Sequence, residues 1–275
     1  MTARPGMDAP AHGVQPLEGR VVIVTGAARG LGRVLAHAMA MAMAGADVAV
    51  TARRTAALAA TIAEIRRCGH RALPVELDLH ERASIAPAID SVVESLGRID
   101  VLICNSGVAG PSVPTWSVTD KEWDETFAVN VTGAFACAQA AARHMLPSRR
   151  GVVLFIGSMT GKRPLLHRAP YAASKMALVG LCRTMALDLG PSKVRVNLLS
   201  PGFVEGERLD WVIDAQATAQ SRPFAVVRDE MLAASPLHRF TTPEEVAHVA
   251  VFLASDLAAG ISGEDINVSS GVVMH

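Results

Sequence analysis

Short runs of hydrophobic residues alternate along this chain with longer stretches in which hydrophobic residues recur at helical spacing. The runs are bounded by turn residues and occupy residues 21–24, 48–51, 72–77, 101–104, 152–156 and 194–199. Because they are continuous and do not alternate with polar residues, they suit parallel strands that are buried on both faces of a sheet. Enough residues separate each run from the next to form a helix. The pattern therefore predicts a doubly wound α/β fold with right-handed crossovers and helices on both faces of the sheet.

The chain contains no internal repeat, low-complexity tract or linker, so we expect a single domain over residues 17–275. Residues 1–16 mix proline, glycine, histidine and alanine without the hydrophobic centre of a signal peptide, and we interpret them as a flexible N-terminal tail. The Ala- and Met-rich segment at residues 34–44 is interrupted by His37. It falls short of the roughly 18 apolar residues of a membrane span and is interpreted as a buried helix.

The composition narrows the class of partner. Hydrophobic residues make up 50% of the 275 residues, which is ample for one core, and 26 Lys and Arg residues balance 26 Asp and Glu residues. Without a net basic field, a small metabolite is a better partner than nucleic acid or an anionic membrane. The four cysteines are far apart and form no Cys-x-x-Cys pair, which disfavours a disulfide framework or a metal site and fits a reducing cytoplasm.

A glycine-rich turn, Thr-Gly-Ala-Ala-Arg-Gly-Leu-Gly at residues 25–32, follows the first predicted strand and opens the first predicted helix. Glycines allow a tight turn and let backbone N–H groups approach a pyrophosphate at the positive end of a helix. Three glycines alone would fit an ordinary strand-to-helix turn equally well, but the position after the first strand favours a dinucleotide. The candidate cofactor contacts in this turn are Gly26, Arg29, Gly30, Leu31 and Gly32.

The end of the second strand indicates which dinucleotide binds. An NAD site places an Asp or Glu there, about 20 residues past the glycines, to bond the ribose 2′-hydroxyl. Here the strand ends without an acid, and Arg53 and Arg54 follow it. Guanidinium groups suit the 2′-phosphate of NADP(H) by bidentate pairing, and Arg29 would add a third positive charge. We therefore expect NADP(H), with NAD(H) as the alternative if Arg53 and Arg54 only solvate the start of a helix.

Tyr171 is the one tyrosine of the chain, and it lies four residues before Lys175 in a segment of helical periodicity that starts at Pro170. Residues four apart share one face of a helix, so the two side chains would project together. A tyrosine with the ordinary pKa of about 10 is a poor base, but a neighbouring ammonium and an oxidised nicotinamide lower that pKa. The phenol could then exchange a proton with the oxygen of a ketone or alcohol, and Ser158 would hold that oxygen. Taken alone, Tyr-x-x-x-Lys is more often an amphipathic surface pair.

Several motifs occur together in one order, and through them the chain resembles the short-chain dehydrogenases/reductases of the one-domain type, close to the 3-oxoacyl-[acyl-carrier-protein] reductases. The motifs are residues 25–32, Asp78-Leu79, Asn105-Ser106-Gly107, Asn130, Ser158, Tyr171 with Lys175, and Pro201-Gly202. The resemblance runs from about residue 17 to the C-terminus. It implies a Rossmann-like, seven-stranded, mostly parallel sheet, whose last strand corresponds to residues 266–271. That strand usually lies at a subunit contact, so a homotetramer is expected.

The resemblance also implies roles for individual residues. Asp78, followed by Leu79, receives the adenine amino group, and the turn from Asn105 to Gly107 flanks the adenosine ribose. Lys175 also binds the nicotinamide ribose. Asn130 holds a water that links Lys175 to solvent, and this relay resupplies the proton that the tyrosine gives away.

Two positions depart from the family's pattern. Cys104 replaces the first asparagine of the usual Asn-Asn-Ala-Gly, which removes no catalytic group. After Pro201 and Gly202 the usual threonine is missing, with Gly206 near its place, which leaves the backbone around Val204 to bond the nicotinamide amide.

Residues 205–236 are irregular in pattern and correspond to a mobile lid over the substrate in such enzymes. The lid contains aromatic and charged residues that either bind the substrate or pack between helices, and the sequence favours neither alternative. These residues are Arg208, Asp210, Trp211, Phe224 and Arg228. His167 and Arg168, directly before Tyr171, fit a solvated loop better than the lining of a substrate site.

These residues together predict an NADP(H)-dependent oxidoreductase that interconverts a ketone and a secondary alcohol, with Asn130, Ser158, Tyr171 and Lys175 as catalytic residues. The alternatives are an NAD-dependent alcohol or polyol dehydrogenase of the same fold and a non-catalytic NADP-binding sensor. A nucleotide-sugar epimerase or dehydratase would carry a different glycine spacing and a larger C-terminal domain. A β-ketoacyl thioester, a cyclic ketone, a sugar-derived ketone and a polyol all fit the same four residues, and NADPH use favours reduction.

Overall fold

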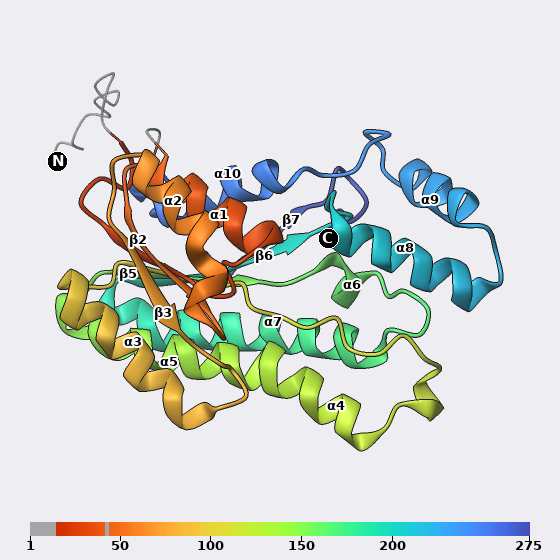
Figure 1. Cartoon of the computed structure of the whole chain (residues 1–275), viewed down its shortest axis with the longest axis horizontal. Coiled ribbons are helices and arrows are strands. Elements are labelled where there is room, and N and C mark those ends of the chain that lie inside the picture. The colour runs from red at the N-terminus through yellow and green to blue at the C-terminus, as the bar shows by residue number, and fades with distance from the viewer. Residues whose placement is uncertain (1–14, 42–43) are drawn as a thin grey trace, which may run out of the picture.

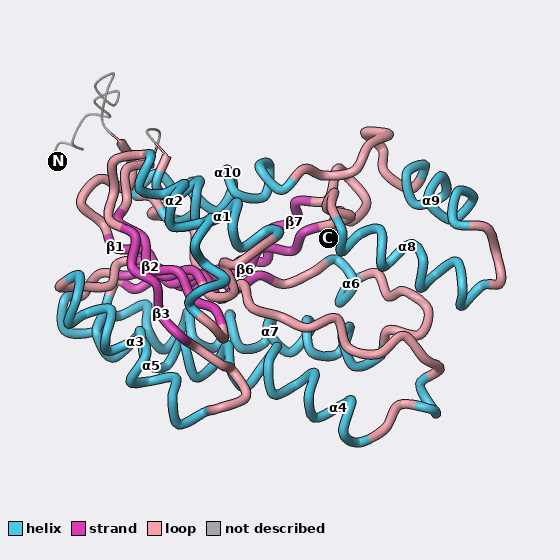
Figure 2. The backbone as a smooth tube through the Cα atoms, viewed as in Figure 1, coloured by secondary structure: helices cyan, strands magenta, loops and turns pink. Residues whose placement is uncertain are grey.

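A central seven-stranded sheet, with strand order β3-β2-β1-β4-β5-β6-β7, organises the molecule (Figures 1 and 2). The computed structural model describes residues 15–41 and 44–275, so the predicted tail lies outside the described residues except for Gln15 and Pro16. All pairings in the sheet are parallel. The strands are β1 (Val21–Val24), β2 (Asp47–Ala52), β3 (Ala72–Glu76), β4 (Val101–Cys104), β5 (Gly151–Ile156), β6 (Val194–Pro201) and β7 (Asp265–Val268). The predicted Rossmann-like fold is confirmed.

The hydrophobic runs mark the strands closely because the middle of the sheet is covered on both faces. Every residue of β1, β4 and β5 is buried. The predicted limits of β1 and β4 agree with the structure, whereas β6 continues to Pro201. The burial of these strands is what removes any alternation of polar residues from their sequences.

Helices cover both faces of the sheet, as Figure 1 shows. On one face lie α1 (Gly30–Ala40), α2 (Ala59–Arg67) and α10 (Pro243–Ala254), which bury Leu35, Ile65 and Leu253 against the strands. On the other lie α3 (Arg82–Leu96), α5 (Ala134–Ser148) and α7 (Ala169–Leu189). The predicted helix at residues 34–44 corresponds to α1, which ends at Ala40. The remaining helices are α4 (Asp120–Phe127), α6 (Met159–Lys162), α8 (Glu207–Gln220) and α9 (Phe224–Ala233), and single 3₁₀ turns occupy Thr55–Leu58, Thr115–Ser117, Gly190–Ser192 and Asp256–Ala258.

The strand order reverses between β1 and β4, which are neighbours in the sheet. The chain leaves β1 toward β2 and β3 on one side, and it leaves β4 toward β5, β6 and β7 on the other. In open α/β sheets a ligand binds outside the carboxyl ends of the strands at such a reversal. The turns after β1 and β4, and the segment after β5, therefore mark the place to look for the site.

The lid at residues 205–236 contains two helices, although the pattern of its sequence is irregular. Helices α8 and α9 lie together at one end of the molecule (Figure 1). They form a small core of their own with Phe203 and Phe240, to which α8 contributes Leu209 and Ile213 and α9 contributes Val227. Few hydrophobic residues on each helix are buried, so the helical pattern is weak in the sequence.

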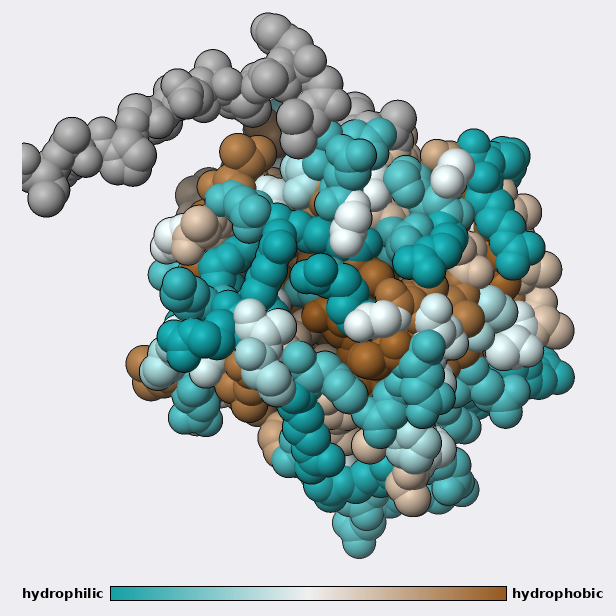
Figure 3. Space-filling model, turned by 90° about the vertical axis from the view of Figure 1, so that its left-hand side faces the viewer, coloured by the Kyte–Doolittle hydropathy of each residue, from teal (hydrophilic) through white to brown (hydrophobic). Residues whose placement is uncertain are grey.

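The end of the molecule opposite α8 and α9 carries mainly hydrophilic side chains, with a hydrophobic patch near the middle of the view (Figure 3). Within residues 15–41 and 44–275, none of the helices combines the length and the hydrophobicity that crossing a membrane requires.

Candidate active site

The glycine-rich turn after β1 leaves room for a phosphate group at the start of α1. The backbone at Gly30 has a φ of +55°, and a Cβ atom there would have no heavy atom within 4 Å. Gly32 serves close packing, since a Cβ atom there would lie 2.2 Å from the carbonyl oxygen of Gly26. Among the described residues, no side chain caps the N-terminus of α1 at Arg29, and the first turn of α1 holds no acidic residue. Free N–H groups at the positive end of a helix fit the pyrophosphate of a dinucleotide.

Side-chain hydrogen bonds join the turn after β1 to the turn after β4. The Thr25 hydroxyl accepts hydrogen bonds from the backbone N–H groups of Asn105 and Ser106, both at 3.0 Å. The Asn105 amide donates to the carbonyl oxygens of Thr25 at 2.9 Å and Gly26 at 3.2 Å. Asn105 thus holds the two turns together, which leaves the backbone of the turn to face a ribose. Thr25 has a part in this junction that the sequence did not single out.

Arg53 and Arg54 follow β2 at the same edge of the sheet, and both are exposed. Neither forms an ion pair within the described part of the chain. Partial burial raises the pKa of Asp78, but hydrogen bonds from His80 and the charge of Arg53 hold this pKa below its ordinary value. The Asp78 carboxylate lies 2.9 Å from His80 Nδ1. Asp78 and Arg53 therefore lie near each other at this edge of the sheet, and their contact with one adenosine group stays a prediction.

Two other predicted cofactor contacts have evident structural partners. Leu79 is buried and packs against Gly133, where a Cβ atom would lie 2.7 Å from the Leu79 Cβ. Arg29 is exposed, and its Nη1 lies 3.8 Å from a carboxylate oxygen of Glu207 at the start of α8. Solvent screens such an exposed pair, so Arg29 remains free to face a phosphate.

Helix α7 carries Tyr171 and Lys175 on one face, and both side chains are buried. The Lys175 ammonium lies 5.7 Å from the centre of the Tyr171 ring and donates a 2.8 Å hydrogen bond to the carbonyl oxygen of Ile156, the last residue of β5. Ser158 lies two residues after the end of β5 and caps α6 by accepting a hydrogen bond from the backbone N–H of Thr160. The structure thus brings Ser158, Tyr171 and Lys175 together at the carboxyl end of β5.

Three cations surround the Tyr171 ring. The guanidinium groups of Arg168 and Arg208 lie 4.8 Å and 5.4 Å from its centre, and Lys175 lies beyond them at 5.7 Å. Burial alone would raise the pKa of Tyr171, but the charges of Arg208, Lys175 and Arg168, together with the Ser158 hydroxyl, lower it to about 8. Burial also lowers the pKa of Lys175 below its ordinary value. A phenol with this pKa can both give and take a proton near neutral pH.

Asn130 lies in a π-helical segment, Ala128–Gly133, between α4 and α5. Such turns are rare and often occur at functional sites. The Asn130 Oδ1 accepts the backbone N–H of Val108 at 2.8 Å, and its Nδ2 donates to the Val108 carbonyl at 3.1 Å and to Ser174 Oγ at 3.0 Å. Ser174 Oγ in turn donates to the Tyr171 carbonyl at 2.8 Å. The Asn130 side chain therefore holds the loop after β4 against α7, and the water relay stays a prediction.

The tight approach at Gly107 explains the glycine in this motif. A Cβ atom at Gly107 would lie 3.2 Å from Asn130 Oδ1 and 3.5 Å from Lys175 Nζ. Gly202 is constrained in a similar way at the end of β6, since a Cβ atom there would lie 2.6 Å from Ser269 Cα. These close approaches hold the strand ends around the site in one arrangement.

The backbone after β6 leaves an N–H group free at Val204, where the sequence predicts a contact to the nicotinamide amide. Val204 forms a parallel bridge with Thr241. In this bridge the Thr241 N–H donates to the carbonyl oxygen of Phe203, and the Glu205 N–H donates to the carbonyl oxygen of Thr241. The N–H of Val204 itself has no hydrogen-bond partner within residues 15–41 and 44–275. It is therefore free to donate to the amide of a nicotinamide.

Arg168 is buried, which corrects the expectation of a solvated loop before α7. Only 3% of this residue is exposed, and its guanidinium is packed between the Tyr171 ring and the Trp211 ring, 4.9 Å from the centre of the latter. His167 has a φ of +60°, a left-handed conformation that turns the chain directly before Arg168. Arginine is rarely buried, so no pattern in the sequence signals this position.

The lid helix α8 packs over the same residues. The Gln216 amide donates a 2.8 Å hydrogen bond to the carbonyl of Leu166, and Arg208 donates to the carbonyl of Gly107 at 3.3 Å. Arg208 and Trp211 thus face the site. By contrast, Arg228 is exposed, and its guanidinium lies 5.6 Å from the centre of the Phe240 ring. Asp210 and Phe224 are exposed.

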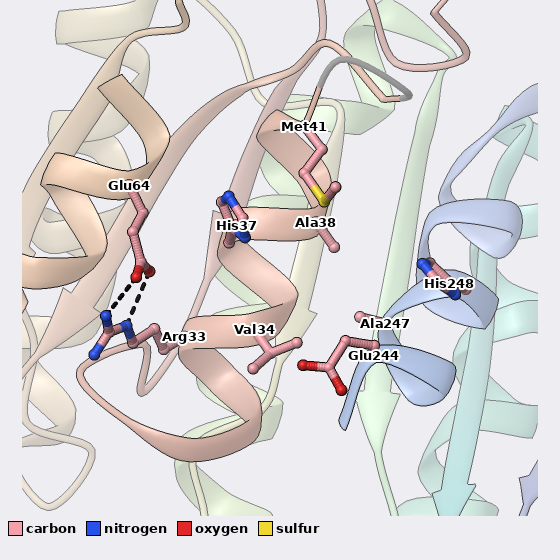
Figure 4. A pocket seen from close by; sticks show the side chains of 9 residues that line it. All are labelled: Arg33, Val34, His37, Ala38, Met41, Glu64, Glu244, Ala247 and His248. Atoms are coloured by element: carbon pink, nitrogen blue, oxygen red, sulfur yellow. Dashed lines mark hydrogen bonds and ion pairs between the residues drawn. The ribbon is translucent and has the colours of Figure 1, made fainter. Parts of the chain in front are cut away.

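A separate pocket of about 230 Å³ lies between α1, α2 and α10 (Figure 4). Arg33 on α1 pairs there with Glu64 on α2, with a 2.9 Å bond from Arg33 Nε. His37 and His248 face this pocket from α1 and α10. No residue of the Tyr171 site lines it, and its strongest charges already neutralise each other. The candidate active site is therefore at the strand ends.

Comparisons with known proteins extend over nearly the whole chain. A family model described as Enoyl-(Acyl carrier protein) reductase matches residues 26–273. A cyclohexanol dehydrogenase of Rhodococcus sp. is 36% identical over 94% of this chain and 97% of its own length. A 3-oxoacyl-[acyl-carrier-protein] reductase of Thermotoga maritima is 32% identical over 94% of this chain and 99% of its own. The crystal structure of NAD⁺-bound xylitol dehydrogenase is similar with a TM-score of 0.89 at 30% identity, covering 93% of this chain and 99% of that chain.

Proposed function

The chain belongs to the short-chain dehydrogenase/reductase family, and on that premise we propose that it interconverts a ketone and a secondary alcohol with NADP(H). It is an oxidoreductase that acts on CH–OH or C=O groups with a nicotinamide nucleotide. The observation that carries the proposal is the buried Tyr171, which has a pKa of about 8 and lies beside Ser158 and Lys175. A group that titrates near neutral pH at a ligand site is suited to proton transfer.

A bound nicotinamide would supply or accept the hydride at the substrate carbon. In reduction, Ser158 holds the ketone oxygen by a hydrogen bond and Tyr171 gives that oxygen its phenolic proton. In oxidation, the Tyr171 phenolate takes the proton from the alcohol. The Lys175 ammonium stabilises the phenolate in either direction, because an opposite charge nearby favours the ionised form.

Other residues hold the reactants and return the proton. The turn at Gly26, Gly30 and Gly32 would accommodate the pyrophosphate, and the free N–H of Val204 would bond the nicotinamide amide. Lys175 would also bond the nicotinamide ribose. Asn130 would hold a water molecule that passes a proton from solvent to Lys175. The backbone carbonyl of Asn130 would bind this water, because the N–H groups of the Asn130 side chain already donate to Val108 and Ser174.

NADP(H) is proposed over NAD(H) because Arg53 and Arg54 stand exposed, without a partner among the described residues, at the end of a strand that lacks an acid. The alternative is an NAD-dependent alcohol or polyol dehydrogenase, which the similarity to NAD⁺-bound xylitol dehydrogenase favours. A homotetramer in the cytoplasm is proposed as the working form.

A panel of ketones and secondary alcohols, followed by nicotinamide absorbance with NADPH and with NADH, tests the proposal. The expected result is turnover of at least one ketone with NADPH preferred over NADH. Preference for NADH would overturn the assignment of Arg53 and Arg54 and leave the alternative. Absence of turnover across ketones and alcohols, with the nucleotide still bound, would favour a non-catalytic NADP-binding sensor.

A further inference from the structure

Arg168 carries a buried positive charge that the protein does not neutralise. Its Nε and Nη1 are buried and lack a hydrogen-bond partner among the described residues. The group that favours its charged form is Tyr171, and no carboxylate contributes. Burial and the neighbouring Arg208 lower the pKa of Arg168 to about 10. A buried charge without a partner is costly, so the position of Arg168 calls for an anion that is not part of the described chain.

Packing of the lid does not account for this arrangement. The guanidinium is packed between the rings of Tyr171 and Trp211 at 4.8 Å and 4.9 Å, which attracts the cation to two aromatic faces. These contacts use the faces of the guanidinium and leave its N–H groups, which lie in its plane, without acceptors. A neutral side chain of similar size would pack between the rings without this cost. The in-plane N–H groups are therefore the feature that needs a ligand.

The surroundings of Arg168 add to the same charge. Arg208 and Lys175 lie around the same tyrosine, and no Asp or Glu contributes to the pKa of Tyr171 or Lys175. Three cations therefore face one site without an acidic side chain to balance them. Lys175 and Arg208 each donate a hydrogen bond to a backbone carbonyl, of Ile156 and Gly107, whereas the buried N–H groups of Arg168 have no acceptor among the described residues.

We propose that the substrate of this enzyme is a keto acid or hydroxy acid whose carboxylate binds Arg168, with Arg208 of the lid closing over the same group. A carboxylate matches the planar N–H pair of a guanidinium in two parallel hydrogen bonds. Because the Arg168 guanidinium lies against the Tyr171 ring, its ligand and the oxygen protonated by Tyr171 can belong to one small molecule. Arg168 is a substrate-binding residue in this scheme. The inference rests on the proposed function and names its substrate class.

Paired substrates test the proposal. Acetoacetate, levulinate and 4-oxocyclohexanecarboxylate differ in the separation of carbonyl and carboxylate, and the methyl ester of each keeps the shape without the charge. For the best of these pairs, we expect the wild-type enzyme to reduce the acid with a kcat/KM about 100-fold above that of its ester. Arg168→Met should bring this ratio close to one, mainly through KM of the acid, and Arg208→Gln should lower it less.

The ratio of acid to ester separates recognition from catalysis. Loss of Arg168 also raises the pKa of Tyr171, but this change affects the acid and the ester alike and cancels in the ratio. Arg163→Met is the matched control, since Arg163 is an exposed arginine on the same loop. It should leave the ratio unchanged. A ratio near one in the wild-type enzyme, or one that survives in Arg168→Met, overturns the proposal while ketone turnover keeps the proposed function.

A measurement on the wild-type protein keeps the proposal testable if Arg168→Met does not fold. Cyclohexanecarboxylate is the probe, and cyclohexanecarboxamide is its neutral counterpart. Binding of the carboxylate beside Arg168 should raise the pKa of Tyr171, read by the ultraviolet absorbance of the single tyrosine. The proposal would be overturned if the carboxylate, up to the solubility limit of its salt, leaves the pKa of Tyr171 unchanged. It would also be overturned if the amide shifts this pKa as much as the carboxylate does. A failure of all ketones to turn over would instead remove the proposed function on which it rests.

Discussion

Replacing Lys175 by methionine should raise the pKa of Tyr171, and an ultraviolet titration of the free protein should show this shift. In the wild type this pKa is about 8, against an ordinary value of about 10. The difference of roughly two pH units corresponds to about 2.7 kcal/mol in favour of the phenolate, and it is reached although burial acts in the opposite direction. The surrounding cations and the Ser158 hydroxyl must therefore together supply more than this amount.

The contributions of Lys175 and Arg208 differ in how far solvent screens them. Arg208 is exposed, so its effect should weaken as salt is added, whereas Lys175 is buried and should be screened little. An opposite charge within about 4–6 Å lowers a pKa by roughly 1–3 units. Lys175→Met should accordingly raise the pKa of Tyr171 by about 1–3 units. Arg208→Gln should also raise it, by an amount that shrinks as salt is added, because Arg208 lies 5.4 Å from the ring centre but is exposed to solvent.

The assay is an ultraviolet titration of the free protein from neutral to alkaline pH. Tyr171 is the one tyrosine, and the three tryptophans do not ionise, so the phenolate absorbance reports a single group. Lys121→Met is a matched control because Lys121 is 85% exposed on α4, and circular dichroism checks that each variant is folded. If Tyr171 titrates at the same pH in Lys175→Met and in the wild type, the account of how this site lowers the tyrosine pKa is wrong.

The same pKa sets opposite pH profiles for the two directions of the reaction. Reduction needs the protonated phenol, so kcat/KM for a ketone should fall as pH rises above about 8. Oxidation needs the phenolate, so kcat/KM for an alcohol should rise with pH and level off above that value.

Three further outcomes follow from the packing and charges of the site. Gly32→Ala should destabilise the fold by about 1–3 kcal/mol and weaken NADPH binding, because the new Cβ would lie 2.2 Å from the Gly26 carbonyl oxygen. Urea denaturation and NADPH titration measure the two effects, and wild-type values in both would contradict the prediction. Arg53→Ser should lower kcat/KM with NADPH by about 10-fold or more and leave NADH unchanged, and an equal loss with both would remove the argument for the 2′-phosphate. Lys162→Met should cost about 3–5 kcal/mol of unfolding free energy because it leaves the buried Asp265 carboxylate unpaired, which chemical denaturation measures; an unchanged midpoint would refute it.

Much of the fold can be predicted from the local pattern of hydrophobic residues along the chain. The middle strands are hydrophobic without interruption because helices cover both faces, which is why β1 and β4 are delimited correctly. The turn at residues 25–32 and the pair Tyr171 and Lys175 were found because their chemistry depends on short spacings. The lid helices were missed because they bury few residues, and the π-helical turn at Asn130 leaves no local signature.

What the sequence did not indicate depends on contacts between distant segments. The burial of Arg168 results from Trp211 on α8 and the left-handed backbone of His167, and neither is visible from the loop's own residues. Thr25 and Ser174 are ordinary residues in sequence, yet each joins two elements around the site. Such roles follow from the tertiary structure, where a side chain's partner decides its function.

The most direct test of the central claim is the turnover of Tyr171→Phe with the best ketone and NADPH. Phenylalanine keeps the ring that packs against Arg168 and removes the proton that the ketone oxygen would receive. The account predicts a loss in kcat of about 100-fold to 10,000-fold with NADPH affinity within a few-fold of the wild type. Turnover at the wild-type rate in this variant would contradict the assignment of Tyr171 as the proton donor.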